Sequence, residues 1–413
     1  MSEVPGRFSR RTALRALAAG SFVALPGLSA CSRSAPTGPP AQGPTLNRYG
    51  TTPNDYALLN LKPDTFYAWE DGFRTAATNS DPRTYEWWHT ELTGDDGIVV
   101  SFTLKTRPGD GLGTESDRRP AVNLLITTPW GNEFSVFQTY DWREFASAPD
   151  HCDVKVGPFT LTGDLKSYQL RGKANDITLN LNLTSTAAPF RPGTGYVYLG
   201  GPEQYQAWFA AVPSGKAEGH IVFYNEKRDF IGTGYHDHTW GNLPLPQFVD
   251  RWRTGMGVAD RYSVIARDIH LRGKYDSTDL TVLLIDDIEA GKRLVAAYND
   301  DTLNATEMQT GEGDDDFAEV QWNYTGDNSA IVTMSATERT VPGRPYVSGT
   351  GSVLPASRTS EAPRKRWYTR NEAEIALSLG TMGPGYRVTG KGTLDNAQFD
   401  LLSGQPTPKP KPS

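Results

Sequence analysis

Two short segments of the sequence concentrate the side chains that can carry chemistry. Residues 85–89 read YEWWH, and residues 232–241 (GTGYHDHTWG) hold two of the six histidines around one aspartate. Imidazoles and a carboxylate side by side among aromatic rings suit proton transfer near neutral pH. We therefore expect His236, Asp237 and His238 to be catalytic. The alternative interpretation is a buried polar network at a domain junction, in which these groups only satisfy one another.

The second segment is predicted to be a strand, in which alternate side chains share a face. One face then carries His236, His238 and Trp240, and the other carries Tyr235, Asp237 and Thr239. A His-x-His pair is half of a typical zinc or iron site, but such a site needs a third and usually a fourth ligand. The spacing nominates none of the candidates, which are His89, His270 and Glu86. We therefore predict no metal.

In the rest of the chain, apolar residues recur with a period of two residues rather than the 3.6 of a helix, which favours strands over helices. Residues 97–104 (GIVVSFTL), 177–181 (ITLNL) and 262–269 (YSVIARDI) are representative. Short antiparallel strands spaced by roughly ten residues are typical of barrels and sandwiches, and roughly twenty of them exceed one small barrel. We predict an all-β protein with two tandem β-barrel domains, residues 49–234 and residues 235–403.

Composition and charge exclude several classes of protein. The 413 residues are 37% hydrophobic, 22% charged and 11% aromatic, which is typical of a globular protein long enough for two domains. A net charge of −7 without a Lys/Arg cluster argues against nucleic-acid partners and anionic lipid surfaces. No apolar run approaches the ~20 residues of a membrane-spanning helix, so an integral membrane protein is not expected.

Residues 1–31 are predicted to be an export signal. Arg10 and Arg11 form a twin-arginine signature before an apolar stretch, and residues 28–31 (LSAC) resemble a bacterial lipobox that would lipidate Cys31. A plain signal peptide with an incidental cysteine is the alternative. Cys152 then lacks a disulfide partner. Residues 32–48 are predicted to be a disordered tether and residues 404–413 a disordered tail, so the protein is expected outside the cytoplasm, lipid-anchored at the cell membrane.

The ordered motifs carry a resemblance to a known family. Glu86-Trp87-Trp88 and residues 234–241, followed by residues 252–257 (WRTGMG) and 262–268 (YSVIARD), resemble the family of carotenoid 1,2-hydratase (hydroxyneurosporene synthase), kievitone hydratase and the fungal lipocalin-like Diels–Alderases. The similarity spans roughly residues 80 to 270. It implies two lipocalin-like β-barrels with the His–Trp motif at their junction.

The resemblance also implies catalytic roles. In the hydratases of the family a strand carboxylate is thought to protonate an alkene, and here His238 and Trp240 match the motif while Asp268 matches the acid. Relatives commonly have an aromatic residue where this chain has Ala266. Such an acid must be kept protonated, which burial favours, and Arg267 is predicted to face away from Asp268. His238 or His236 would then act as the base that aims the water.

Aromatic side chains are the candidate substrate-binding groups, because π faces stabilise a carbocation. Trp87 and Trp88 point to opposite faces of a strand, so we expect at least one of them to be packing, and Glu86 to bond across to the His–Trp motif. The candidate substrate-binding residues are Trp240, Tyr235, Trp87, Trp88, Glu86 and Trp252.

The function expected from these features is an exported hydratase that adds water to an alkene of a hydrophobic, prenyl or isoprenoid-type substrate by acid catalysis. No Gly-rich phosphate loop is present, so no cofactor is expected. One alternative is a pericyclase or cyclase that folds a polyene into a reactive conformer. The other is a lipocalin-like binding lipoprotein that carries an apolar molecule unchanged.

Overall fold

The computed structural model describes residues 47–398, except residues 79, 82, 109–118, 131, 175, 224, 300, 309–318, 341–343 and 346–366. The predicted signal, Cys31, most of the predicted tether and the predicted tail lie outside the described residues. No helix of the described part is long and apolar enough to cross a membrane. The described residues of Pro44–Ser413 belong to one compact unit.

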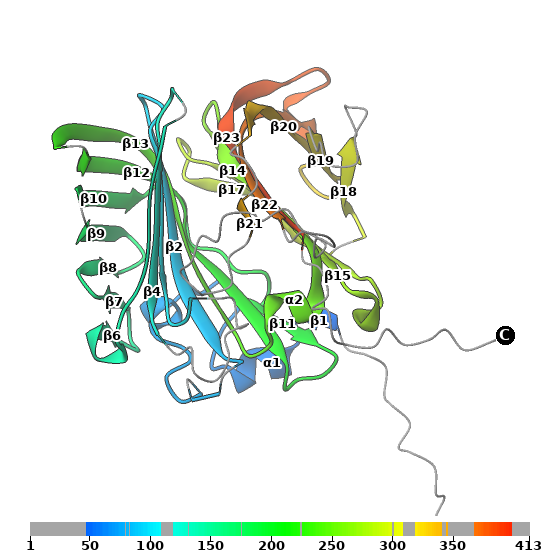
Figure 1. Cartoon of the computed structure of the whole chain (residues 1–413). Helices are drawn as coiled ribbons and strands as arrows, with labels where there is room; N and C mark the ends of the chain where they lie inside the picture. The colour runs from blue at the N-terminus through cyan, green and yellow to red at the C-terminus, as the bar shows by residue number, and fades with distance from the viewer. Residues whose placement is uncertain are drawn as a thin grey trace, which may run out of the picture. The chain divides into compact units, whose positions relative to one another are not determined.

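The structure is nearly all-β, and its strands form two antiparallel sheets, a half-barrel and a nearly closed barrel (Figure 1). The prediction of two β-barrel domains in an all-β protein is confirmed. The first sheet has the order β5-β4-β3-β2-β13-β12-β10-β9-β8-β7-β6, with β11 pairing β12 and β1. The second has the order β17-β16-β15-β14-β23-β22-β20-β19-β18, with β21 pairing β22.

The strands of the first sheet are β1 (Asn47–Tyr49), β2 (Tyr85–Gly94), β3 (Val99–Lys105), β4 (Ala121–Thr127), β5 (Glu133–Thr139), β6 (Phe145–Ser147), β7 (Cys152–Val156), β8 (Phe159–Gly163), β9 (Ser167–Ala174), β10 (Ile177–Ser185), β11 (Tyr196–Leu199), β12 (Tyr205–Phe223) and β13 (Glu226–Gly241). Those of the second are β14 (Val249–Ala259), β15 (Tyr262–Leu271), β16 (Asp279–Asp287), β17 (Lys292–Tyr298), β18 (Leu303–Met308), β19 (Glu319–Tyr324), β20 (Ala330–Thr340), β21 (Arg344–Pro345), β22 (Trp367–Leu379) and β23 (Val388–Gln398).

Helices are few and short. The α-helices are α1 (Pro53–Leu58) and α2 (Leu245–Phe248), and the 3-10 helices are η1 (Ala68–Asp71), η2 (Trp142–Glu144), η3 (Gly273–Tyr275) and η4 (Gly380–Met382). Helix α1 begins at a capping box in which the Thr52 hydroxyl accepts from the Asp55 amide and the Asp55 carboxylate accepts from the Thr52 amide.

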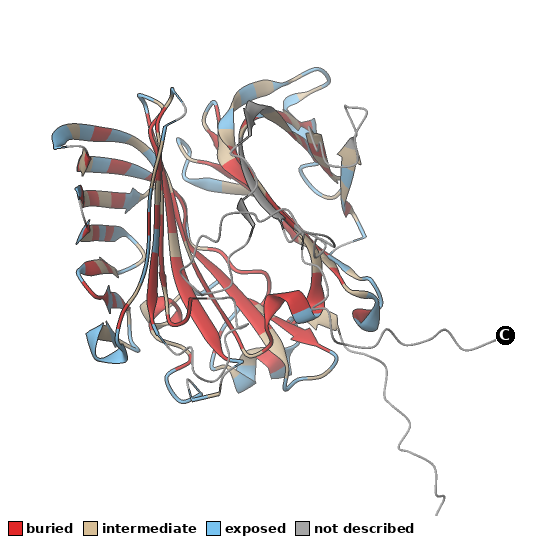
Figure 2. Ribbon diagram, viewed as in Figure 1, coloured by how far each residue is buried: buried red, intermediate tan, exposed pale blue. Residues whose placement is uncertain are grey.

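Alternation of apolar and polar residues explains how the strands form a barrel wall. In β10 the four apolar residues Ile177, Leu179, Leu181 and Leu183 are buried, and the polar residues between them are half-buried. Three apolar cores result, one inside each sheet and one between the sheets. Figure 2 shows buried residues concentrated along β2, β12 and β13 near α2.

The chain passes between the sheets through residues 242–248, which include α2. The predicted domain boundary after residue 234 lies inside β13, which stays in the first sheet up to Gly241. The second sheet begins at Val249. The boundary is displaced because the polar motif occupies a long buried strand rather than a linker.

Candidate active site

His236 lies inside the first sheet with both ring nitrogens hydrogen-bonded. Its Nδ1 donates to the His89 carbonyl oxygen at 2.8 Å, and its Nε2 lies 3.1 Å from Oδ2 of Asp71. The same Oδ2 accepts a hydrogen bond from the Tyr168 hydroxyl at 2.6 Å. Because a carbonyl oxygen only accepts, Nδ1 carries a hydrogen, and Nε2 then meets a carboxylate. These contacts are those of an imidazolium–carboxylate pair.

The pKa directions agree with an ion pair. Burial opposes both charges, but the Asp71 carboxylate raises the pKa of His236 above its usual value. The charge and hydrogen bond of His236 lower the pKa of Asp71 against the same burial effect. Burial, reinforced by Asp71, raises the pKa of Cys152 and of Tyr168 well above their usual ranges. The shifts therefore favour the charged pair, and they favour the neutral forms of Cys152 and Tyr168.

His238 forms a parallel arrangement two residues along the strand. Its Nδ1 donates to the Glu70 carbonyl oxygen at 3.0 Å, and its Nε2 lies 2.8 Å from Oε1 of Glu86. The Glu86 carboxylate also accepts from the Arg74 amide at 2.7 Å, the Thr75 amide at 2.8 Å and the Thr75 hydroxyl at 2.6 Å. The predicted bond from Glu86 to the His–Trp motif is confirmed. Both oxygens of the Glu86 carboxylate are therefore hydrogen-bonded to groups of the protein.

Two indoles cover the His238 ring. The Trp88 ring stacks on the His238 ring with their centroids 4.7 Å apart. The centroid of the Trp240 ring lies 4.6 Å from that of the His238 ring. Trp88 donates to the Asp71 carbonyl oxygen at 3.0 Å, and Trp240 donates to the Tyr196 hydroxyl at 3.0 Å. Both indoles belong to the core of the first sheet, so they act here as packing.

One group of side chains in this core has the composition of a metal site. Ligand atoms of Asp71, Cys152 and His236 lie within 4.8 Å of one another, and all three residues are buried. The acceptor oxygen of Asp71 is, however, already bonded to His236 and Tyr168, and burial raises the pKa of the Cys152 thiol. A metal would need a thiolate and a free imidazole nitrogen, so these residues do not fit one in this arrangement.

The opposite face of β13 lies in the core between the sheets. The Tyr235 hydroxyl donates to Oδ2 of Asp237 at 2.6 Å, and the Trp208 indole donates to the same oxygen at 3.1 Å. Oδ1 of Asp237 is shielded from solvent and has no hydrogen-bond partner among the described residues. Burial, followed by the Asp237 charge, raises the pKa of Tyr235 well above its usual value. This face therefore offers one unused carboxylate oxygen.

The strand β2 brings His89 to the same face. His89 is the cross-strand partner of Asp237, and Glu91 is the partner of Tyr235. The His89 Nδ1 bonds to the Thr103 hydroxyl at 3.0 Å, and its Nε2 lies 3.7 Å from Glu91 Oε2. Trp87 lies on this face as well, so Trp87 and Trp88 line different cores, as the alternation predicted.

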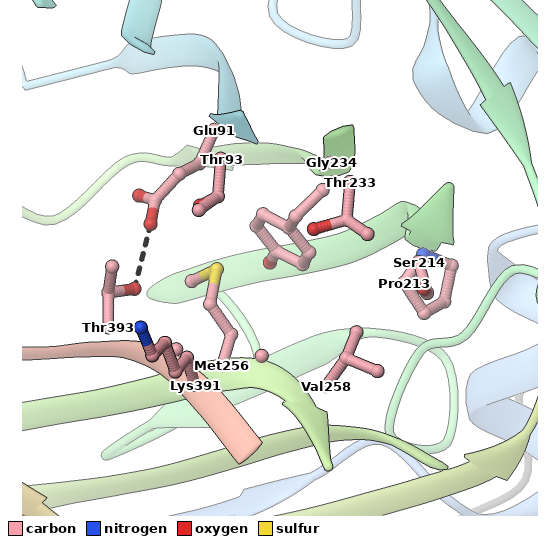
Figure 3. A pocket seen from close by; sticks show the side chains of 13 residues that line it. Glu91, Thr93, Pro213, Ser214, Thr233, Gly234, Met256, Val258, Lys391 and Thr393 are labelled. Atoms are coloured by element: carbon pink, nitrogen blue, oxygen red, sulfur yellow. Dashed lines mark hydrogen bonds between the residues drawn. The ribbon is translucent and has the colours of Figure 1, made fainter. Parts of the chain in front are cut away.

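A small cleft of about 60 Å³, open to solvent, lies between the sheets beside these residues (Figure 3). In Figure 3 the Glu91 carboxylate accepts a hydrogen bond from the Thr393 hydroxyl across the cleft, at 2.7 Å. The remaining wall mixes apolar and small residues with one exposed lysine. The lining residues are Glu91, Thr93, Pro213, Ser214, Thr233, Gly234, Tyr235, Met256, Gly257, Val258, Lys391, Gly392 and Thr393.

The second sheet contributes Arg267 and Trp252 to the core between the sheets. The Arg267 guanidinium lies 4.1 Å from the Trp208 ring centroid and 5.2 Å from the Trp252 ring centroid. Trp252 is half-buried, and its indole donates to the Thr254 hydroxyl. Trp252, a predicted substrate-binding residue, therefore borders the same core as Tyr235.

Asp268 is placed on the other side of β15. Val264 and Ala266, which share its strand face, belong to the core inside the second sheet. Its carboxylate lies 3.6 Å from Arg253 and 3.7 Å from Arg251. Burial and then Asp279 raise the pKa of Asp268, while the two arginines lower it.

The predicted catalytic residues therefore do not form one site. Arg267 faces away from Asp268 as expected, but Arg253 and Arg251 approach from the neighbouring strand, which the sequence spacing did not indicate. No described hydrogen bond or ion pair joins Asp268 to His236 or His238. The histidines lie inside the first sheet, Asp268 inside the second, and Asp237 between them.

Several residues of these clusters were missed from the sequence. Asp71 and Tyr168 come from a 3-10 turn and a strand that are remote in sequence from β13, so spacing cannot pair them. His89 was weighed only as a metal ligand, although its place in YEWWH put it on the Trp87 side of the strand. Trp208 carried no local signal.

Comparisons with known proteins agree with the fold. No family model matches the chain. Hydroxyneurosporene dehydrogenase of Chlorobaculum tepidum is 31% identical over 85 residues, which cover 19% of this chain and 22% of that protein. The match thus spans about a fifth of the curated relative's length.

Solved structures extend the likeness over most of the chain. CghA superposes with a TM-score of 0.56 at 14% identity, covering 77% of this chain and 89% of CghA. Kievitone hydratase of Nectria haematococca superposes with a TM-score of 0.50 at 14% identity, covering 86% and 97%. The resemblance seen in the motifs is confirmed at the level of the fold: this chain has the fold of CghA and kievitone hydratase.

Proposed function

We propose that this protein is a hydratase that binds an apolar, isoprenoid-type small molecule in the cleft between the sheets and adds water to one of its alkenes. The observation that carries the proposal is the unused Oδ1 of Asp237, held beside the cleft-lining Tyr235. A buried acceptor without a partner is rare in folded proteins unless a ligand or water uses it. The existence of a hydratase with this fold supports the same conclusion.

Asp237 is the group that handles the proton in this proposal. Tyr235 and Trp208 hold Oδ2 from one side, so the carboxylate is fixed and Oδ1 is left to accept from a water molecule. For an alkene conjugated to a carbonyl or carboxylate group, the water oxygen bonds to the β carbon, the alkene electron pair shifts onto the oxygen of that group, and a proton of the water passes to Oδ1. The same proton is then delivered to the second alkene carbon, which leaves Asp237 unchanged and the substrate one water heavier.

The other predicted catalytic groups serve this site less well. Both ring nitrogens of His236 and of His238 already meet acceptors inside the first sheet. Asp268 lies behind β15 relative to the cleft, next to two arginines. Its role as the proton donor stays a prediction, and the contrast with Asp237 is open to direct test.

The test is incubation of the purified protein in H₂¹⁸O with a panel of isoprenoids and prenylated phenols, followed by mass spectrometry. We expect one product heavier by one labelled water, and its loss in Asp237→Asn. Asp229→Asn changes an exposed aspartate of the same strand and is the matched control. Ligands that bind and are recovered unchanged would overturn the proposal and indicate a carrier.

A cyclase is the second candidate, because the same cleft can fold a flexible polyene without a proton donor. Its support is that the cleft is lined largely by small and apolar residues from five strands of the two sheets. An isomeric product of unchanged mass, formed also by Asp237→Asn, is the result that would establish it.

We also propose that the protein is exported and lipid-anchored, on the basis of Arg10, Arg11 and Cys31. Replacing both arginines by lysine should retain the protein in the cytoplasm. Cys31→Ser should release it from the membrane fraction. Membrane association that survives Cys31→Ser would contradict the anchor.

A further inference from the structure

Arg267 is a buried cation without an ionic partner among the described residues. Its side chain is 4% exposed, and its contacts with those residues are the two indole faces of Trp208 and Trp252. No described residue accepts a hydrogen bond from its guanidinium, and its Nε is both shielded from solvent and unbonded. A buried arginine is rarely left unpaired, because removing its charge from water is costly.

The other buried arginines of the described chain show how unusual this is. Arg191 binds Glu70 at 2.6 Å together with three carbonyl oxygens, and Arg107 binds the Thr84 and Asp81 carbonyl oxygens. Arg253 binds Glu307. Each of these three arginines donates hydrogen bonds to acceptors of the protein. The Arg267 guanidinium donates none to the described residues.

Arg267 is buried in the core between the sheets, two strand positions from the residues that line the cleft. It shares a strand face with Ile265 and is the cross-strand partner of Thr254, and Ile265 in turn is the partner of the cleft-lining Met256. It also acts electrostatically on Tyr235, which lines the cleft and holds Asp237. A ligand that extends two strand positions, about 7 Å, past Met256 would therefore reach the guanidinium.

We infer that Arg267 binds a carboxylate of the ligand, and so selects apolar substrates that carry one. The inference rests on the proposed function only in taking the cleft as the ligand site. A guanidinium pairs with two coplanar oxygens through parallel hydrogen bonds, and the flanking indoles keep it planar and dry. A diphosphate carries more charge than one guanidinium balances, and Glu91, which lines the cleft, would repel it more strongly than it repels a single carboxylate.

This assignment also specifies the alkene. If the double bond is conjugated to the recognised oxygen group, the electrons displaced by the incoming water move onto that oxygen, beside Arg267. The carbon then takes the proton from Asp237, and the charge on the oxygen returns to its starting state. A free carbocation next to an unpaired guanidinium would instead be repelled, so this site favours conjugated over isolated alkenes.

The test uses three probes with one isoprenoid chain and different heads: farnesoate, farnesol and farnesyl diphosphate. Binding to the purified protein is measured by calorimetry, with intrinsic tryptophan fluorescence as a second readout. We expect farnesoate to bind at least tenfold more tightly than the other two. Arg267→Met should abolish the preference, Arg267→Lys should reduce it, and Arg261→Met, at a half-buried arginine that pairs with Asp287, should leave it unchanged.

Thermal unfolding separates recognition from a structural role. Because Arg267→Met removes an uncompensated buried charge, it should keep or raise the Tm of the free protein while losing farnesoate. Equal binding of the three probes by the wild-type protein, or a preference that survives in Arg267→Met or Arg267→Lys at full strength, would overturn the inference. Binding needs no turnover, so absence of labelled product in H₂¹⁸O would refute the hydratase and leave this result standing.

Discussion

The two faces of β13 both carry titratable side chains, but these side chains differ in how completely they are hydrogen-bonded. On the inner face, the four ring nitrogens of His236 and His238 meet two carbonyl oxygens and two carboxylates, all inside the first sheet. On the outer face, Asp237 keeps an unbonded oxygen, and Arg267 packs nearby without an acceptor from the described residues. Both faces therefore carry titratable groups. Oδ1 of Asp71 on the inner face also lacks a hydrogen-bond partner among the described residues, so incomplete bonding alone does not separate the two faces. What distinguishes the outer face is that its incompletely bonded groups lie near a cleft.

The largest effect is expected from Asp237→Asn. The amide keeps the shape of the carboxylate but cannot take a proton from water, so kcat/KM should fall by roughly 10²- to 10⁴-fold. The Tm should change little, because the Tyr235 and Trp208 donors retain an oxygen to bind. Near wild-type turnover in Asp237→Asn would show that Asp237 does not handle the proton in this reaction.

On the inner face, His236→Ala should damage stability rather than catalysis. Asp71 would remain buried without its cation, which costs about 3–5 kcal/mol in comparable buried pairs. Urea denaturation measures the free energy of unfolding, and the rate per folded molecule should stay within a few-fold of wild type. Unchanged stability with lost turnover would reverse the assignment of the two faces.

The same ion pair predicts how stability depends on pH. Since the pKa of His236 is raised from 6.5, its contribution is full below pH 6.5 and is lost as the pH rises through the raised value. Since the pKa of Asp71 is lowered from 3.8, its contribution is full above pH 3.8 and is lost as the pH falls through the lowered value. The pair therefore stabilises the folded protein most between about pH 4 and 6.5.

Denaturation curves across this range provide the measurement. The wild-type protein should lose stability above neutral pH, and His236→Gln should lack that loss. A loss of equal size in the variant would mean that another group titrates there.

The smallest effects should come from a matched pair of tryptophans. Trp208→Phe removes the donor to Asp237 and one indole from Arg267, so turnover should fall by up to about tenfold. Trp240→Phe removes the bond to Tyr196 and shrinks the ring that packs on His238, both inside the first sheet, and should cost about 1 kcal/mol of stability. Steady-state kinetics and denaturation of both variants would show whether Trp208→Phe mainly lowers turnover and Trp240→Phe mainly lowers stability.

Sequence reasoning reached the fold and the division of β13 into two faces, because the period of two in a strand is local. It also reached the bond from Glu86 to the His–Trp motif, in which the structure shows His238 to be the partner. It did not predict that Asp71 would pair with His236 or that Tyr168 would donate a hydrogen bond to Asp71, because these contacts join segments that are remote in the chain. Asp268 was grouped with the histidines from motif order, whereas strand pairing sets it beside Arg253 on the far side of β15.

The most direct test of the account compares two aspartates in one reaction. The initial rate of ¹⁸O incorporation from H₂¹⁸O is measured for wild type, Asp237→Asn and Asp268→Asn with the same isoprenoid substrate. The account predicts a loss of at least about 100-fold in Asp237→Asn and a rate within about threefold of wild type in Asp268→Asn. Loss of incorporation in Asp268→Asn alone would contradict it and move the reaction into the second sheet.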